Sequence, residues 1–351
     1  MKPILDFSVW HSIKSAWRDC FTAFLILLAC LLAGAAQAAT RPNFVFVLLD
    51  DMELAPVGSM RWTKNLIRNQ GTEFQRAYLA VPLCSPSRAS ILTGKYPQNT
   101  HVFTNYGHND FYANGDDAST IAVWLKRVGY RTSLIGKYMN NYPSPASKTY
   151  IPPGWDNWQA RYAGTPYDGQ YNYKMKENGV LTSYGSASSD YSTDVYRNKA
   201  VAFVKDAMAR QTPFFLYLGL HTPHSPFVPA PRDAALFPTV KAPRPRSFNE
   251  ADVSDKPAYV RNRPRLTTSQ ISTIDKGYRN RVRMVQAADK AVKALIDALT
   301  AGGQYANTYS SLRPTMVGSW GRTASQGPRG RPTRKCCAWR SLCAAPACRP
   351  G

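Results

Sequence analysis

The hydrophobic pattern along the chain predicts buried strands that end in polar residues. The segment "PNFVFVLLDD" (42–51) is a nearly unbroken apolar and β-branched run that closes with two acids. Such a run is typical of a central strand that is buried on both faces of a parallel sheet. The segments "RTSLIGKY" and "PFFLYLGLHTPHSP" predict two more strands, and residues 74–81 predict a short one. Because open α/β sheets bind ligands at the carboxyl ends of their strands, we expect a functional site where these runs end.

Segments with helical periodicity lie between the predicted strands. The segments "STIAVWLKRVGY", "DVYRNKAVAFVKDAMARQ" and "YRNRVRMVQAADKAVKALIDALTAGG" predict helices, and glycine closes the first and the third. Residues 62–69 are also helix-like. Two long stretches rich in Pro, Tyr, Asn and Gly, 138–190 and 226–265, predict loops that cover or build a site. This alternation of strand and helix favours a doubly wound α/β sheet.

The N-terminus has the layout of a secretory signal peptide. Scattered basic residues precede or flank an apolar run from Phe21 to Leu32, and small residues follow at 36–38. We therefore expect residues 1–38 to be removed and the protein to be exported. The apolar run is short for a spanning helix, although an uncleaved anchor is an alternative.

The cysteines do not form an evident disulfide framework. Of the seven, two lie in the signal region, four lie in the last sixteen residues, and Cys84 stands alone in the middle. Cysteines of exported proteins tend to pair. An isolated thiol at Cys84, in a predicted loop between two apolar runs, is therefore not expected to be structural.

The net charge of +22 is unevenly distributed. Residues 310–351 contain eight Lys or Arg and no Asp or Glu. Elsewhere, "KAPRPRS" and "YVRNRPRL" are basic and could attract a polyanionic substrate, although a solvated basic surface explains them equally well. We do not expect a nucleic-acid partner, because the basic tail does not look like a segment that was meant to be translated.

Side chains that can act in catalysis or bind a metal follow three of the predicted strands. They are the acid pair Asp50 and Asp51, the base Lys137, and His224. Each has a structural explanation when taken alone, since an acid pair can cap a loop, a lysine is usually solvated and a histidine is often hydrogen-bonded. Together with "CSPSRASILTGKYP", however, they make the chain resemble the sulfatase family of the alkaline-phosphatase-like superfamily. That family's Cys-x-Pro-x-Arg and Thr-Gly-Lys/Arg elements are matched by Cys84, Pro86, Arg88, Thr93, Gly94 and Lys95.

The resemblance covers roughly residues 41–309 and implies a fold. It implies an alkaline-phosphatase-like α/β fold, with a doubly wound mixed sheet flanked by helices, and makes 39–309 the N-terminal part of the catalytic domain. The segments "LLDDMEL", "IGKYMNNY" and "YNYKMKENG" are most similar to the glucosamine-6-sulfatase branch, which acts on sulfated glycosaminoglycans.

The resemblance also implies a mechanism. A formylglycine-generating enzyme would oxidise Cys84 to formylglycine. One hydroxyl of the hydrated aldehyde would attack sulfur, and deprotonation of the other would expel sulfate and restore the aldehyde. Asp50 and Asp51, beside the modified Cys84, would hold Ca²⁺, or alternatively Mg²⁺.

Further roles follow from the same resemblance. Arg88 and Lys95 would fix the aldehyde and the charge of the metal site, while Lys137 and His224 would contact the sulfate or the leaving oxygen. Many members carry a histidine where Met139 stands, and the branch has an asparagine nearby that Asn140 would match. The remaining histidines are weaker candidates (His101, His221) or a surface residue (His108).

The chain departs from the family after residue 309. The family pattern requires a later strand ending in Ser-Asp-Asn-Gly, which completes the metal site, and then a further lysine. Back-translating residues 310–318 and regrouping the bases one position earlier yields Val-Leu-Thr-Ser-Asp-Asn-Gly-Trp. Two later segments, regrouped in the same way, also yield short sequences that resemble the family. We therefore predict a shifted reading frame, with 310–351 an unstructured tail, a fold incomplete at the C-terminus, and a chain that is inactive or poorly folded.

Other functions stay open at this point. A phosphodiesterase or phosphonate hydrolase of the same superfamily would share the nucleophile and metal layout. A non-catalytic, secreted glycan-binding protein would fit the basic surface and the lost half of the metal site. We expect a sulfated glycan as partner and no stable membrane association after signal cleavage. The chain has no Asn-x-Ser/Thr sequon, which favours a periplasmic or secreted enzyme over a lysosomal one.

Overall fold

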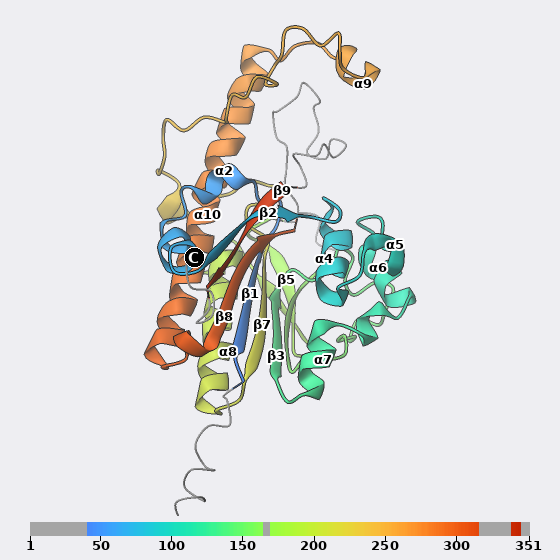
Figure 1. Ribbon diagram of the computed structural model, residues 1–351, viewed down its shortest axis with the longest axis vertical. Coiled ribbons are helices and arrows are strands. Elements are labelled where there is room, and N and C mark those ends of the chain that lie inside the picture. Colours follow the sequence, from blue (N-terminus) through green and yellow to red (C-terminus); the bar gives the residue numbers. More distant parts are fainter. Residues whose placement is uncertain (1–40, 164–168, 316–337, 345–351) are drawn as a thin grey trace, which may run out of the picture. The chain divides into compact units, whose positions relative to one another are not determined.

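Nine strands within the described residues form one sheet, in the order β2-β9-β8-β1-β7-β3-β4-β5-β6 (Figure 1). The structure is a computed structural model and describes residues 41–163, 169–315 and 338–344. The predicted signal peptide therefore lies outside the described residues. None of the described helices is both long enough and apolar enough to cross a membrane.

The centre of the sheet is parallel, as the apolar run at 42–51 predicts. Parallel neighbours join five strands: β8 (Thr308–Pro314), β1 (Asn43–Leu49), β7 (Phe214–Leu220), β3 (Arg131–Gly136) and β4 (Asn157–Tyr162). The edges are antiparallel and consist of β2 (Thr72–Tyr78), β9 (Ala338–Ala344), β5 (Tyr173–Glu177) and β6 (Val180–Tyr184). The sheet is therefore mixed, and the predicted fold class is confirmed. Leu49 is in register with both Leu220 and Pro314, so these strands end at the same level.

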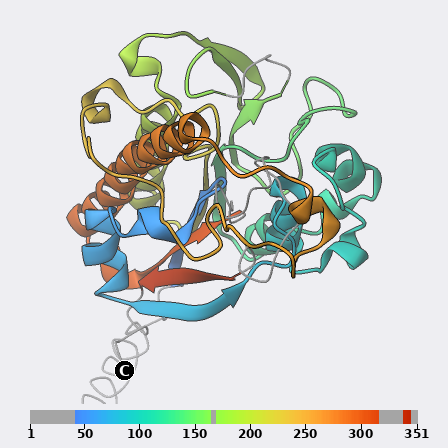
Figure 2. The ribbon, with the colours of Figure 1, turned by 90° about the horizontal axis from the view of Figure 1, so that it is seen from above.

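Helices cover both faces of the sheet (Figure 2). One face packs against α8 (Ser192–Ala209) and α10 (Thr268–Ala301), and the other against α4 (Cys84–Thr93), α6 (Gly107–Ala113) and α7 (Ile121–Arg127). Side chains alternate along β1, so that Val45 and Val47 face the first layer and Leu48 faces the second. Shorter helical segments are α2 (Leu54–Val57), α3 (Arg61–Thr63), a π-helix (Lys64–Arg68), α5 (Pro97–Thr100) and α9 (Ala258–Arg261), and short 3₁₀ helices lie at Asp116–Ala118, Ser188–Asp190, Pro231–Asp233 and Tyr305–Asn307.

Helix α10 is longer than its apolar pattern predicts. The pattern begins at residue 278, whereas the helix begins at Thr268. Thr267 and Gln270 form a reciprocal capping box there, which starts the helix ten residues before the apolar pattern begins. The glycine stop is confirmed, because the helix ends at Ala301 and Gly302 follows.

The prediction that 138–190 is loop is wrong for three strands, β4, β5 and β6. Strands β5 and β6 are joined by Asn178 and Gly179, which have φ angles of 47° and 100°. Asn-Gly between two strands is the preferred two-residue hairpin turn, because both residues need positive φ. That dipeptide was a signal that could have identified the hairpin.

The prediction that 310–351 is unstructured is also wrong for the part that the structure describes. Residues 310–314 continue strand β8, with Ser310, Leu312 and Pro314 buried and the residues between them partly covered. Ala338–Ala344 forms β9, which pairs with both β8 and β2. A strand needs only backbone hydrogen bonds to its neighbours, so a segment with little hydrophobic periodicity can still join the sheet. The rest of the predicted tail lies outside the described residues.

Candidate active site

Three predicted residues meet because their strands are parallel and end together. Asp50 follows β1 and its backbone N–H donates to the Thr222 carbonyl at 3.1 Å, just beyond β7. Lys137 follows β3 and its backbone N–H donates to the Gly219 carbonyl at 2.8 Å. His224 lies in the turn after β7. The carboxyl edge of the sheet is therefore the place where these side chains gather, as the apolar runs predict.

Two glycines let the strands β3 and β7 approach closely at this edge. Gly136 has a φ of +97°, and a Cβ there would lie 2.2 Å from the Gly219 carbonyl oxygen. A Cβ on Gly219 would lie 2.4 Å from the Lys137 carbonyl oxygen and 3.3 Å from Arg88 Nη1. Side chains at these two positions would therefore push Lys137 and Arg88 apart.

Cys84 is the first residue of helix α4, and not part of a loop as predicted from sequence. Pro86 fits because the first helical turn has no backbone acceptor for its missing N–H. Arg88 lies one turn after Cys84, on the same side of the helix. Gly94 ends the helix in the left-handed conformation, with a φ of 71°.

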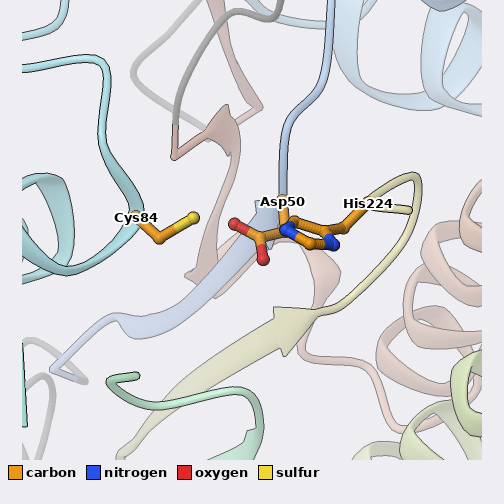
Figure 3. A group of neighbouring side chains, drawn as sticks. All are labelled: Asp50, Cys84 and His224. Carbon is orange, nitrogen blue, oxygen red and sulfur yellow. The ribbon is translucent and has the colours of Figure 1, made fainter. Parts of the chain in front are cut away.

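Cys84, Asp50 and His224 form the centre of the site (Figure 3). One ligand atom from each lies within 4.8 Å of the others, and all three side chains are buried. Asp51 joins this group, because its Oδ1 lies 3.8 Å from Cys84 Sγ and its Oδ2 lies 3.5 Å from His224 Nε2. His221 Nδ1 is 3.8 Å from Asp50 Oδ2. Helix α4 and the ends of β1 and β7 thus bring these residues to one point.

Cationic side chains surround the Asp50 carboxylate. Lys137 Nζ lies 2.6 Å from Oδ2, and Arg88 Nη2 lies 3.4 Å from Oδ1. The Thr315 hydroxyl donates to Oδ1 at 2.6 Å. Burial alone would raise the pKa of Asp50, but the charges of Lys137 and Arg88 outweigh it and hold that pKa well below the usual value. Asp50 is therefore ionised in the folded protein.

The electrostatic environment of Asp51 is the reverse. Burial and the adjacent Asp50 charge raise the pKa of Asp51 above its usual value. A carboxylate that is buried beside another negative group calls for a cation, and carboxylate oxygens suit a hard divalent ion. The donor set of the described residues therefore fits such an ion in kind, although two aspartates supply fewer oxygens than the six to eight that Ca²⁺ takes. This is a possible metal site.

The Cys84 thiol is in poor surroundings for a nucleophile. Burial, followed by the Asp50 charge, raises its pKa far above the usual value. A reactive cysteine needs the thiolate, which forms in electropositive and partly exposed positions. Cys84 is 1% exposed and faces two carboxylates. As an unmodified thiol, Cys84 is therefore unsuited to attack a substrate.

Asn140 contacts the start of α4 and follows the buried Met139. The Asn140 backbone N–H donates to the Ser85 hydroxyl at 3.1 Å, and its Oδ1 accepts from that hydroxyl at 3.2 Å. Asn105 Oδ1 accepts from the Ser85 backbone N–H at 3.2 Å. Both asparagines therefore fix the residue that follows Cys84.

Some predicted residues lie elsewhere. Lys95 follows the glycine that ends α4, pairs with Asp116 at 3.0 Å and has a side chain that is 45% exposed. The prediction that Lys95 fixes the aldehyde is not supported by this position, because Cys84 begins the ten-residue helix α4 and Lys95 lies beyond its other end. His101 is exposed. His108, predicted as a surface residue, is 1% exposed and its Nδ1 lies 2.7 Å from the Ser144 carbonyl.

The comparisons with known proteins agree with this geometry. The profile of the sulfatase family matches residues 42–309, which is more than half of the chain. The chain therefore belongs to the sulfatase family.

One relative and two solved structures illustrate the similarity. The N-acetylglucosamine-6-sulfatase of Capra hircus is 35% identical over 291 residues, which are 80% of this chain and 51% of that protein. A protein solved with its substrate D-glucosamine-2-N,6-O-disulfate superimposes with a TM-score of 0.65 at 19% identity, over 87% of this chain and 71% of that one. A phosphonate monoester hydrolase of Silicibacter pomeroyi superimposes with a TM-score of 0.59 at 18% identity, over 89% of this chain and 69% of that one. The two structural likenesses show the fold alone, and the chain spans about half the length of its curated relative.

Proposed function

We propose that this site belongs to an exported sulfuric ester hydrolase that removes sulfate from a sulfated carbohydrate of the glucosamine-6-sulfate kind. The observation that carries the proposal is the convergence of Cys84, Asp50, Asp51 and His224 at the carboxyl edge of the sheet. The goat relative of 35% identity, which is named for this activity, supports the choice of substrate. Cleavage of the predicted N-terminal signal would place the enzyme in the periplasm or outside the cell.

The proposed nucleophile is formylglycine made from Cys84. Its aldehyde hydrate supplies a hydroxyl group that the buried thiol lacks, and it allows the enzyme to be regenerated after sulfate leaves. The raised thiol pKa supports this, because a group that remains protonated at neutral pH is of little use as a nucleophile. The start of α4 adds the positive end of a ten-residue helix beneath the developing negative charge.

The proposed metal is Ca²⁺, with Mg²⁺ as the alternative. Asp50 and Asp51 would hold the ion, which when bound would neutralise charge on a sulfate oxygen and favour ionisation of the nucleophile. The raised pKa of Asp51 supports the presence of a cation beside it.

Charged side chains of the chain itself would bind and orient the substrate. Lys137 and Arg88 lie on the Asp50 side and would attract the sulfate group. His224 lies on the Asp51 side, where its Nδ1 is 2.6 Å from the Ser225 carbonyl. A proton on Nδ1 would donate to that carbonyl, which leaves Nε2 to face the reacting atoms and to exchange a proton with the leaving sugar oxygen.

A shifted reading frame after Tyr309 is part of the proposal. Strand β8 carries the chain to Asp50, where the Thr315 hydroxyl contacts Oδ1. In the shifted frame, residues 310–318 would instead read Val-Leu-Thr-Ser-Asp-Asn-Gly-Trp. The codon of the aspartate in that segment uses the last base of codon 314 and the first two bases of codon 315. The strand therefore supports the proposal, because a carboxylate would stand beside Asp50 and add the ligand that the present site lacks.

The experiment compares this chain with a frame-restored chain, made from a gene with a single-base correction near codon 309. Mass spectrometry of the Cys84 peptide, after co-expression with a formylglycine-generating enzyme, tests the modification. Parallel assays with sulfate esters, phosphate diesters and phosphonate esters test the reaction. Sulfate release that is lost in Cys84→Ala supports the proposal. Preferential cleavage of phosphorus esters would replace it with a phosphodiesterase or phosphonate hydrolase, and heparin binding without turnover would replace it with a glycan-binding protein.

A further inference from the structure

Helix α10 contacts the backbone of the site through a buried arginine. Arg281 is 1% exposed and lies in the middle of the helix. Its Nη2 donates to the backbone carbonyl of Asp51 at 2.6 Å. Its Nη1 forms an ion pair with Glu53, whose side chain is 2% exposed. One guanidinium therefore holds two positions of the turn that follows β1.

The turn that Arg281 holds has an unfavourable backbone conformation. Asp51 has a φ of +56°, in the left-handed region that residues with a Cβ rarely adopt. Such a conformation persists only where the surroundings fix it. Glu53 precedes helix α2 at its N-cap position, yet its side chain makes no capping hydrogen bond and turns to Arg281 instead. The bonds of Arg281 to the Asp51 carbonyl and to Glu53 therefore oppose relaxation of this turn.

The same turn of α10 also supports the segment that carries His224. Asn280 Nδ2 donates to the Phe227 carbonyl at 3.1 Å, and the Arg281 guanidinium lies 5.7 Å from the centre of the Phe227 ring. The two side chains that face the proposed metal and the leaving oxygen, Asp51 and His224, are thus both held from this helix.

We infer that Arg281, together with Glu53, is a positioning residue that keeps the Asp51 carboxylate aimed at Cys84 and the metal. This inference rests on the proposed function for the role of Asp51. Arg281 does not touch the reacting atoms, and it acts by holding the Asp51 carbonyl. A lysine at this position would carry the same charge, but one ammonium group cannot reproduce the planar fork that reaches both Glu53 and Asp51.

The test uses variants that separate positioning from stability. Arg281→Met combined with Glu53→Leu replaces the buried ion pair by apolar side chains, which proteins often tolerate. Arg281→Lys keeps the charge and removes the fork. Arg244→Met is the control, because Arg244 pairs with Asp275 of the same helix at 2.7 Å, and Asp275 lies about 9 Å along the helix from Arg281.

Two measurements are made on each full-length variant that unfolds cooperatively. Hydrogen exchange of peptides covering residues 49–56 reports on the turn, and calorimetric titration with Ca²⁺ reports on the site without any need for turnover. We expect the double variant to exchange about tenfold faster in this peptide and to bind Ca²⁺ about 10–100-fold more weakly. The exchange rate and the Ca²⁺ affinity of Arg281→Lys should lie between those of the double variant and those of the parent. Both values should match the parent in Arg244→Met.

Unchanged exchange at residues 49–56 in the double variant would overturn the inference. If that variant does not fold, Arg281→Lys decides the question by the same measurement. A parent chain that neither binds Ca²⁺ nor hydrolyses sulfate esters, even when frame-restored, would instead count against the proposed function. In that case the exchange comparison still decides whether Arg281 holds the turn.

Discussion

Asp50 and Asp51 are neighbours in sequence, yet they lie in opposite electrostatic environments. Asp50 contacts Lys137, Arg88 and Thr315, and its pKa is held well below the usual value even though burial acts in the other direction. Asp51 contacts Cys84 and His224, and its pKa is raised by burial and by Asp50. The fold therefore neutralises one carboxylate and leaves the other in need of a cation.

This difference teaches how two identical side chains acquire separate roles. Asp50 continues the direction of β1 and is surrounded by groups from β3, α4 and β8, so its charge stabilises the fold. Asp51 turns into the left-handed region and so points toward the start of α4. Cations of the chain thus offset the burial of the Asp50 carboxylate, whereas they do not offset that of the Asp51 carboxylate.

The largest effect is expected on the Asp51 side, at Cys84, the residue proposed to give the nucleophile. In a frame-restored chain, Cys84→Ala should reduce kcat for sulfate esters by roughly 10⁴ to 10⁶, as removal of other nucleophiles does. The measurement is sulfate release, with thermal unfolding as a check on folding. If kcat fell by less than about tenfold, Cys84 could not be the precursor of the nucleophile.

The Asp50 side should show the largest effect on stability. Asp50→Asn leaves the buried cations Lys137 and Arg88 without their carboxylate, so we expect a loss of about 3–5 kcal/mol in the free energy of unfolding, measured with urea. The same contribution should be present above the unfolded pKa of about 3.9 and be lost as the pH falls through the lowered folded value. Asp206→Asn is the control and should stay near the parent, because the Asp206 side chain is 44% exposed where it pairs with Arg131 and Arg210.

Asp51→Asn should behave differently. Because its raised pKa makes the charged form unfavourable in the folded chain, neutralising it should leave the free energy of unfolding unchanged within about 1 kcal/mol or increase it. Its own contribution to stability should decrease as the pH rises through its raised folded pKa. The same variant should lose any increase in melting temperature caused by Ca²⁺. Destabilisation as large as that of Asp50→Asn would remove the distinction between the two carboxylates.

Lys95→Ala should have the smallest effect. Its side chain is 45% exposed, although its partner Asp116 is buried, so we expect a smaller loss of stability than the roughly 3–5 kcal/mol of Asp50→Asn. We expect kcat and KM of the frame-restored chain to change less than about twofold, because the pair lies outside the site. Lys137→Ala is the matched comparison and should be far more damaging. A large kinetic loss in Lys95→Ala would show that this lysine reaches the site after all.

The sequence predicted the sheet centre and most of the site because both depend on local signals. The apolar runs identified β1, β3 and β7, and acids or bases at their ends identified Asp50, Asp51 and Lys137. The hairpin of β5 and β6 was missed, although Asn178 and Gly179 signalled it. Strand β8 was missed because its place depends on hydrogen bonds to β1, which no periodicity reveals.

A sequence motif does not show which of its residues reach the site. Lys95 is part of the family motif, yet Gly94 ends α4 before it and turns the chain toward Asp116. Arg281 and Thr315 could not be found in advance, because their contacts with the site join residues more than 200 positions apart. A motif therefore identifies the residues of one helix or strand, but not those that other elements bring to it.

The burial of Cys84 limits when the proposed conversion of Cys84 to formylglycine could take place. The contacts that close the site join Asp50 to Lys137 across 87 positions and to Thr315 across 265, so it forms only after distant strands have paired. Once it has formed, a thiol that is 1% exposed is out of reach of another enzyme. Any enzyme that converts Cys84 must therefore act on the chain before it folds, and slow pairing of these strands lengthens the time available for it.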